Sequence, residues 1–341
     1  MSIKKPDIKE LLKTRVLVLD GAMGTMIQRY KLEEEDYRGD RFKNATILQK
    51  GNNDILCLTQ PQIIQTIHEK YLEAGADIIE TNTFNGTRVS QSDYGLEDYV
   101  YEINREAAKL ARKAADKFTL TNPDKPRYVA GAMGPTNKTA SMSPEVGDPG
   151  FRNISFDELY TNYHEQASAL LEGGADILLI ETVFDTLNAK AALMAVNDLM
   201  KEKGRKVPVM VSGTISDNSG RTLSGQTLEA FLNSVSHIDL LSVGLNCSLG
   251  AEQLRPHLEE LSKKAPFPVS VYPNAGLPNQ FGEYDETPEV MGRHIKDFLD
   301  NKFVNIVGGC CGTTPDHVRK IAQEAALANR REVPAQIMLP S

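Results

Sequence analysis

Two adjacent cysteines near the C-terminal end of the sequence have the clearest potential for chemistry. Cys310 and Cys311 lie in the segment V-N-I-V-G-G-C-C-G, residues 304–312. Neighbouring side chains of a regular strand point to opposite faces, so the two sulfurs would diverge if the strand continued. The glycines around them allow the backbone to leave strand geometry. Both thiolates can then face one point, an arrangement that suits a soft metal ion.

The composition is that of a globular protein long enough for a large α/β barrel. The chain has 341 residues, of which 40% are hydrophobic and 25% charged, and its net charge is −8. The negative charge argues against nucleic acid or an anionic membrane as a partner. The sequence has no apolar run of about 18 residues and no apolar signal-peptide core at its charged N-terminus. We therefore expect a cytoplasmic protein with reduced cysteines.

A repeat that runs through the chain predicts how the cysteines are positioned. Eight apolar segments rich in β-branched residues alternate with segments of helical character, and the apolar segments lack the alternation of a solvent-facing sheet. We expect strands at 16–20, 76–84, 128–135, 176–183, 207–215, 240–247, 269–276 and 304–310. We expect helices between them at 61–74, 100–118, 156–172, 186–203, 228–237, 251–264, 288–301 and 315–328.

Eight β-then-α units predict an α/β fold of the (β/α)8 TIM barrel type, with the active site at the C-terminal rim of the strands. An open doubly wound sheet is the alternative, although it seldom uses eight even repeats. We assign residues 1–328 to this single domain and 329–341 to a tail or a linker to further modules. A short helix at 5–14 is expected to cap one end. Two insertions, at 28–58 and 136–155, are expected on the active-site face.

A third cysteine falls at the same rim, because Cys247 ends the strand 240–247 in the run G-L-N-C. Three cysteines suit zinc, and three protein ligands leave a fourth position open for catalysis. A vicinal disulfide between Cys310 and Cys311, or plain buried thiols, are the alternatives. Cys57 lies outside this group and is expected to pack in the core. Three thiolates outweigh the charge of a zinc ion, so such a centre favours a further sulfur ligand and alkyl transfer to a thiol.

Further segments extend this pattern over nearly the whole chain. They are L-D-G-A-M-G-T-M at 19–26, G-N-N-D at 51–54, E-T-N-T-F-N at 80–85, G-P-T-N-K-T-A-S at 134–141, E-T-V-F-D-T-L-N-A-K at 181–190 and P-N-A-G-L-P-N at 273–279. Together with G-L-N-C and G-G-C-C-G they resemble the homocysteine S-methyltransferase family. Within it they are most similar to the N-terminal homocysteine-binding module of cobalamin-dependent methionine synthases.

The resemblance implies zinc-dependent transfer of a methyl group to the thiol of homocysteine, which gives methionine. It implies that methylcobalamin supplies the methyl group from a separate cobalamin-binding module, and that methyltetrahydrofolate on a folate-binding module restores it. These modules would lie in the same polypeptide or in separate subunits. The chain has no D-x-H-x-x-G run of the kind that the cobalamin module uses. The methyl donor would therefore come from outside this chain.

Candidate residues for the amino-acid end of homocysteine follow the first and fourth strands. The backbone amides at Gly21, Ala22 and Met23 are candidates for its carboxylate. Asp20 and Glu181 are candidates for its ammonium group, and the resemblance implies the same roles. Asn246, beside Cys247, is included in this site as the residue that fixes the surrounding loop.

Three other functions compete with this prediction. A homocysteine methyltransferase could use S-methylmethionine or betaine, for which an aromatic cage would be expected, but the chain has no Trp. A phosphate-handling barrel could use the glycines before the last helix, which would leave the two cysteines unexplained. A zinc-stabilised scaffold would need a fourth ligand; His317 is close in sequence, although a structural role in the helix start is expected for it.

Overall fold

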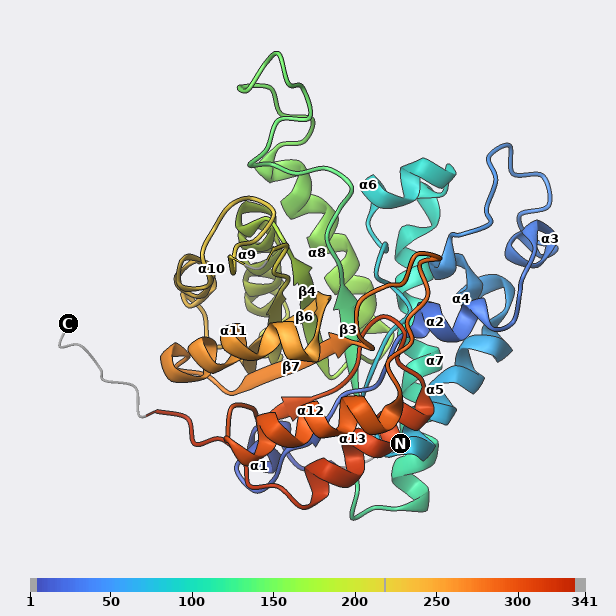
Figure 1. Cartoon of the computed structure of the whole chain (residues 1–341). Coiled ribbons are helices and arrows are strands. Elements are labelled where there is room, and N and C mark those ends of the chain that lie inside the picture. Colours follow the sequence, from blue (N-terminus) through green and yellow to red (C-terminus); the bar gives the residue numbers. More distant parts are fainter. Residues whose placement is uncertain (1–4, 218, 335–341) are drawn as a thin grey trace.

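Eight parallel strands form one sheet in the order β1-β8-β7-β6-β5-β4-β3-β2 (Figure 1). In the computed structural model, which describes residues 5–217 and 219–334, the parallel bridge between Leu19 and Ile78 joins the two ends of this sheet. The N–H groups of Asp77 and Asp20 add hydrogen bonds to Val18 O and Ile78 O at the same seam. The sheet is therefore a closed barrel, and the predicted (β/α)8 fold is confirmed.

The predicted elements are present, and their bounds differ mainly at the ends of strands. The strands are β1 Leu17–Val18, β2 Ile78–Glu80, β3 Tyr128–Met133, β4 Ile177–Val183, β5 Val209–Gly213, β6 Ser242–Gly250, β7 Val269–Asn274 and β8 Ile306–Val307. The main helices are α5 Pro61–Ala74, α7 Val100–Thr121, α8 Phe156–Glu172, α9 Thr186–Glu202, α10 Leu228–Val235, α11 Ala251–Lys264, α12 Pro288–Asp300 and α13 Pro315–Ala326. The strand predicted at 304–310 ends at Val307, because the backbone after it turns into the rim loop.

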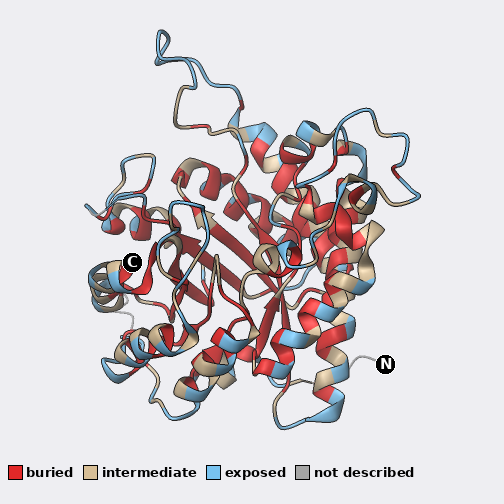
Figure 2. Cartoon of the chain, turned by 45° about the vertical axis from the view of Figure 1, so that its right-hand side comes forward, coloured by how far each residue is buried: buried red, intermediate tan, exposed pale blue. Residues whose placement is uncertain are grey.

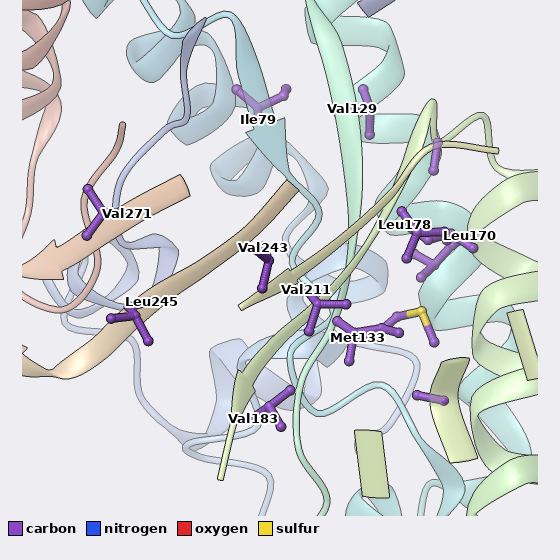
Figure 3. Close-up of a cluster of buried hydrophobic side chains, with 14 of the residues drawn as sticks. Ile79, Val129, Met133, Leu170, Leu178, Val183, Val211, Val243, Leu245 and Val271 are labelled. Atoms are coloured by element: carbon purple, nitrogen blue, oxygen red, sulfur yellow. The ribbon is translucent and has the colours of Figure 1, made fainter. Parts of the chain in front are cut away.

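Alternate residues of each strand fill two apolar layers. One layer lies inside the barrel and includes Leu17, Ile78, Leu179 and Ile306. The other, part of which is drawn in Figure 3, lies between the sheet and the helices; there Leu178 of β4 packs near Leu170 of α8. Buried residues accordingly run along both faces of the strands, whereas exposed residues lie on outer helix faces and loops (Figure 2). This double burial explains why the strands lack a polar face in the sequence.

The first helix, α1 (Ile8–Leu12), covers the N-terminal end of the barrel. Its buried residues Ile8 and Leu12 belong to the same apolar cluster as the inner strand residues. The predicted cap is thus confirmed. Because this end is closed, access to the barrel axis is from the opposite rim.

Polar side chains at the start of three even-numbered strands fix the register of this end. In each, the side-chain oxygen accepts the N–H of a residue of the preceding strand, and the main-chain N–H donates to the carbonyl of that same residue. The pairs are Asp77 with Val18, Asp176 with Val129 and Asn305 with Val269. The aspartates end the sequence phrases E-A-G-A-D and E-G-G-A-D, so these phrases encode both the helix end and the strand register. At the start of β6, the fourth even-numbered strand, the equivalent residue is Leu241, which makes only the main-chain hydrogen bond.

The two insertions lie on the C-terminal side of the barrel, as predicted (Figure 1). The first carries short helices that the sequence did not reveal, α3 (Glu34–Arg38), η1 (Asn53–Ile55) and α4 (Leu56–Thr59), and it follows α2 (Met23–Gln28). The second, at 136–155, has no helix or strand and extends away from the barrel as the green loop of Figure 1. Further short helices, α6 (Arg88–Gln91), η2 (Ser92–Tyr94) and η3 (Glu97–Tyr99), precede α7.

The segment 329–334 packs on the barrel rather than extending from it. Arg331 is 3% exposed and donates to the carbonyls of Ser262, Ala265 and Phe267. Residues 335–341 of the predicted tail lie outside the described residues, so the division at 328 stays a prediction. None of the helices that the structure describes has the length and apolar character needed to cross a membrane.

Loss of one of these register contacts is expected to destabilise the barrel. Asp77→Ala removes the acceptor of the buried Val18 N–H and the partner of Arg15, whose two terminal nitrogens lie 2.9 Å from the carboxylate. We expect a loss of about 3 kcal/mol in the free energy of unfolding, measured by denaturant titration. Asp239→Ala is the control, because Asp239 is exposed and pairs only with Lys9. Equal losses in the two variants would contradict the role of Asp77.

A buried histidine is expected to make stability depend on pH. His68 is fully buried with no hydrogen-bond partner among the described residues, and burial lowers its pKa to about 4. Because the unfolded chain has a His pKa of about 6.5, it takes up a proton below that pH while the folded state stays neutral, so stability falls as the pH drops from 6.5 towards 4. Between pH 7 and pH 5 this should cost about 2 kcal/mol. His68→Leu should remove that part of the pH dependence of unfolding; an unchanged dependence would contradict it.

Candidate metal centre and active-site cleft

The three predicted cysteines converge at the C-terminal rim of the barrel. The sulfurs of Cys247, Cys310 and Cys311 all lie within 4.8 Å of one another, and Cys247 Sγ is 3.8 Å from Cys311 Sγ. All four cysteines are free in this structure, and no disulfide joins Cys310 to Cys311. Among the described His, Cys, Asp and Glu residues, this is the only group of three or more with ligand atoms spaced for one metal ion. Cys57 is buried elsewhere, as predicted.

The loop after β8 is held by backbone bonds to both neighbouring strands. Gly309 N–H donates to Asp20 O, and Cys310 N–H donates to Pro273 O. The regular strand ends at Val307, and these two bonds tie the loop that follows to the segment after β1 and to β7. Gly312, at φ +81°, completes the turn, and the side chain of Tyr284 packs where a Cβ on this glycine would lie. The glycines therefore turn the two sulfurs towards one point, as the sequence predicted.

Asn274, at the end of β7, fixes Cys311. Its side-chain oxygen accepts the N–H of Cys311 at 3.1 Å, and the carbonyl of Cys311 accepts the N–H of Ala275. Asn274 is 2% exposed, so this bond is shielded from water. The segment P-N-A-G contained this residue, but only the structure reveals its contact with the cysteine loop.

Asn246, the residue before Cys247, fixes the backbone at the third cysteine. Its side chain is fully buried, accepts the N–H of Thr182 and the hydroxyl of Ser212, and donates to Thr182 Oγ1. Cys247 and Thr182 both have left-handed backbones, at φ +60° and +55°. Such strain in non-glycine residues persists only where the surroundings enforce it. Asn246 thus holds two strand ends in shape without lining the cleft.

The ionisation of the sulfurs favours a bound cation. Hydrogen bonds from Cys247 and Cys310 lower the pKa of Cys311 to about 3. The pKa of Cys310 is raised well above its usual value by hydrogen bonds with Cys247 and Cys311 and by burial. Without a cation, therefore, the three sulfurs hold one stable thiolate, because further negative charges would repel it. A metal ion between them would allow the others to ionise.

A cleft of about 780 Å³ opens above the sulfurs. Among the residues that line it are all the predicted site residues except Asn246, namely Asp20, Gly21, Ala22, Glu181, Cys247, Cys310 and Cys311. Its acidic lining residues are Asp20, Asp54, Glu80, Glu181, Glu283 and Asp285, whereas Arg29 is the one basic residue among those that the structure places there. The cleft therefore favours a ligand with a positive charge.

The deepest carboxyl groups are strongly perturbed. Burial, followed by the charge of Glu80, raises the pKa of Asp20 well above its ordinary value, and the same factors act on Glu181. The pKa of Glu80 itself is raised to about 7, chiefly by burial. Perturbed carboxyls in a cleft are typical of a functional site.

Sequence reasoning missed several residues of this cleft, among them Glu80, Tyr272 and Tyr284. Glu80 ends β2, Tyr272 lies on β7, and Tyr284 lies in the loop before α12. Glu80 was detectable, because it opens the quoted segment E-T-N-T-F-N at the end of a predicted strand. Tyr284 offered no such signal, since its position depends on how the loop folds back. His317 has the predicted structural role: it bonds Thr314 at the start of α13 and the carbonyl of Glu286.

Comparison with known proteins places this geometry in context. A model of the homocysteine S-methyltransferase family matches residues 17–325. The metallated form of the homocysteine methyltransferase MmuM from Escherichia coli superposes with a TM-score of 0.70 at 23% identity, covering 93% of this chain and 99% of that one. Its oxidised form gives a TM-score of 0.71 at 23% identity, with 93% and 98% covered. At this identity the structural likeness concerns the fold.

Removal of the Asn274 side chain is expected to weaken metal binding. Asn274→Ala frees the N–H of Cys311, so the loop loses its fixed geometry, and affinity should fall 10- to 100-fold. Cd²⁺ titration, followed by the ultraviolet absorption of cadmium–thiolate bonds, measures this. Asn137→Ala is the control, because Asn137 is exposed and bonds Asp93. Equal affinities in both variants would show that Asn274 does not position Cys311.

Proposed function

This chain belongs to the homocysteine S-methyltransferase family, and we propose that it activates the thiol of homocysteine with a zinc ion held by Cys247, Cys310 and Cys311. Methyl transfer to that thiol gives methionine. The observation that carries the proposal is the convergence of three sulfurs on the floor of an acidic cleft. The opposite end of the barrel is covered by α1, so substrate would enter from the C-terminal rim, where the cleft lies.

The sulfur positions fit zinc. Tetrahedral zinc with bonds of about 2.3 Å to sulfur requires sulfurs about 3.8 Å apart, and Cys247 Sγ and Cys311 Sγ lie 3.8 Å apart. Three cysteines leave the fourth position for the substrate. Zinc bound there would hold the substrate sulfur as a nucleophilic thiolate.

Residues around the sulfurs orient the amino-acid end of homocysteine. Asp20 and Glu181 are proposed to bind the ammonium group, because they are buried in the cleft and lie within 4.0 Å of no Lys, Arg or His nitrogen in the described chain. The N–H of Ala22 already donates to Thr313 Oγ1, which leaves those of Gly21 and Met23 as donors to the carboxylate. Gly21 suits this task, since a larger residue would clash with Tyr71 and Thr313.

The proposed methyl donor is methylcobalamin presented by a separate module, with methyltetrahydrofolate as the ultimate source. Support comes from the sequence segments outside the metal centre, which resemble cobalamin-dependent methionine synthases. The acidic cleft also favours a second candidate, a homocysteine methyltransferase that uses the cationic donors S-methylmethionine or betaine, with Tyr272 and Tyr284 as aromatic contacts. Methionine formation with each donor separately distinguishes the two.

Zinc K-edge X-ray absorption tests the mechanism directly. The zinc-loaded protein should show three sulfur ligands and one nitrogen or oxygen ligand, and saturating homocysteine should change this to four sulfurs. Cys310→Ser should lose zinc, while Cys57→Ser, whose cysteine lies outside the centre, should retain it. An unchanged sulfur count with homocysteine would rule out activation by direct binding of the thiol to the metal.

A further inference from the structure

The floor of the cleft holds one carboxyl group more than the proposed ammonium contacts require. Glu80 lies beside both of them: its N–H donates to Asp20 Oδ2 at 3.1 Å, and it lines the same cleft as Glu181, whose pKa is raised first by burial and then by the charge of Glu80. Within the described chain, no Lys, Arg or His nitrogen lies within 4.0 Å of any of these three carboxyls, although 26 such ion pairs exist elsewhere. The group thus lacks the cation that buried carboxylates ordinarily need.

A purely structural role does not explain this arrangement. Asp77, a buried carboxylate with a structural role, accepts a strand N–H and pairs with Arg15. Glu80 has no such partner, and it lines the cleft. A shared metal ion does not explain it either, because among the described acidic, His and Cys side chains only the three cysteines meet the spacing for one ion.

A second unsatisfied group lies in the same floor. The hydroxyl of Tyr272 is buried, lines the cleft and has no hydrogen-bond partner in the described part of the chain. Burial, followed by the charges of Glu181 and Glu80, raises the pKa of this hydroxyl well above its usual value. The missing ligand group must therefore bring a positive charge and several hydrogen bonds, as a protonated primary amine with three N–H donors does.

We infer that Glu80 is the third carboxyl of the ammonium subsite and that it determines specificity for thiols carrying a protonated α-amine. The inference rests on the proposed function, because it takes the amino acid homocysteine as the ligand. With three carboxyls around the amine, a thiol that lacks this amine would leave all three of them in the cleft without a cation. Such a thiol is rejected although its sulfur can still reach the metal.

The test compares L-homocysteine with 4-sulfanylbutanoate, which has the same thiol and carboxylate but no amine. Isothermal titration of each into the zinc-loaded protein gives the ratio of the two dissociation constants. Because both ligands share the sulfur and carboxylate contacts, the ratio isolates the amine. Glu80→Gln should reduce the preference for homocysteine at least ten-fold by weakening homocysteine binding, with 4-sulfanylbutanoate affinity and zinc content unchanged.

Glu286→Gln is the matched control, because Glu286 is a half-buried carboxyl in the loop before α12 and does not line the cleft; it should keep the wild-type ratio. A wild-type ratio in Glu80→Gln overturns the inference. If Glu80→Gln does not fold, Glu80→Asp replaces it, because the shorter side chain moves the carboxylate back by one methylene group. The ratio of the two dissociation constants should then fall several-fold, and an unchanged ratio overturns the inference. If the zinc-loaded wild-type protein binds neither ligand, the proposed function itself fails.

Discussion

The constraint on which the functional end of the molecule depends is the approach of three sulfurs to one another. Thiolates at about 4 Å repel strongly, so the rim must hold them together through bonds that are unrelated to sulfur chemistry. Asn246 and Asn274 supply these bonds from two neighbouring strands, and both are buried. The left-handed backbone of Cys247 and the turn at Gly312 are the conformational costs of the same arrangement. A bound cation relieves the repulsion, which ties metal binding to the shape of the rim.

Carboxyl groups at the two ends of the barrel differ in whether they have cationic partners. At the N-terminal end, Asp77 and Asp176 accept strand N–H groups and pair with Arg15, Lys5 and Arg112. These carboxylates are satisfied, and they fix the strand register. At the rim, Asp20, Glu80 and Glu181 lie close together with no cation of the described chain beside them. Burial raises the pKa of all three, and under the proposed function the ammonium group of the substrate supplies the missing cation.

Sequence reasoning predicted the barrel, the convergence of three cysteines and part of the cleft lining because these follow from local signals. Eight repeats give the fold, and strand ends of a barrel converge, so Cys247 and Cys310 could be brought together without coordinates. The short helices of the first insertion were missed, since their form depends on packing against the barrel. The same limit applies to two tyrosines of the cleft. Tyr284 reaches the cleft only because its loop folds back, and Tyr272 looks in the sequence like an ordinary buried residue of a strand.

The division between the two ends also explains how the site can be strained without unfolding the domain. The strands share two apolar layers and a closed end under α1, so their C-terminal ends extend from a rigid base. β1 and β8 end at Val18 and Val307, so Asp20 and the cysteine loop lie beyond the regular strands. Gly309 N–H donates to Asp20 O, so the cysteine loop and the acidic floor of the cleft share one backbone contact. Under the proposed function, this contact connects the residues assigned to the sulfur of the substrate with those assigned to its amine.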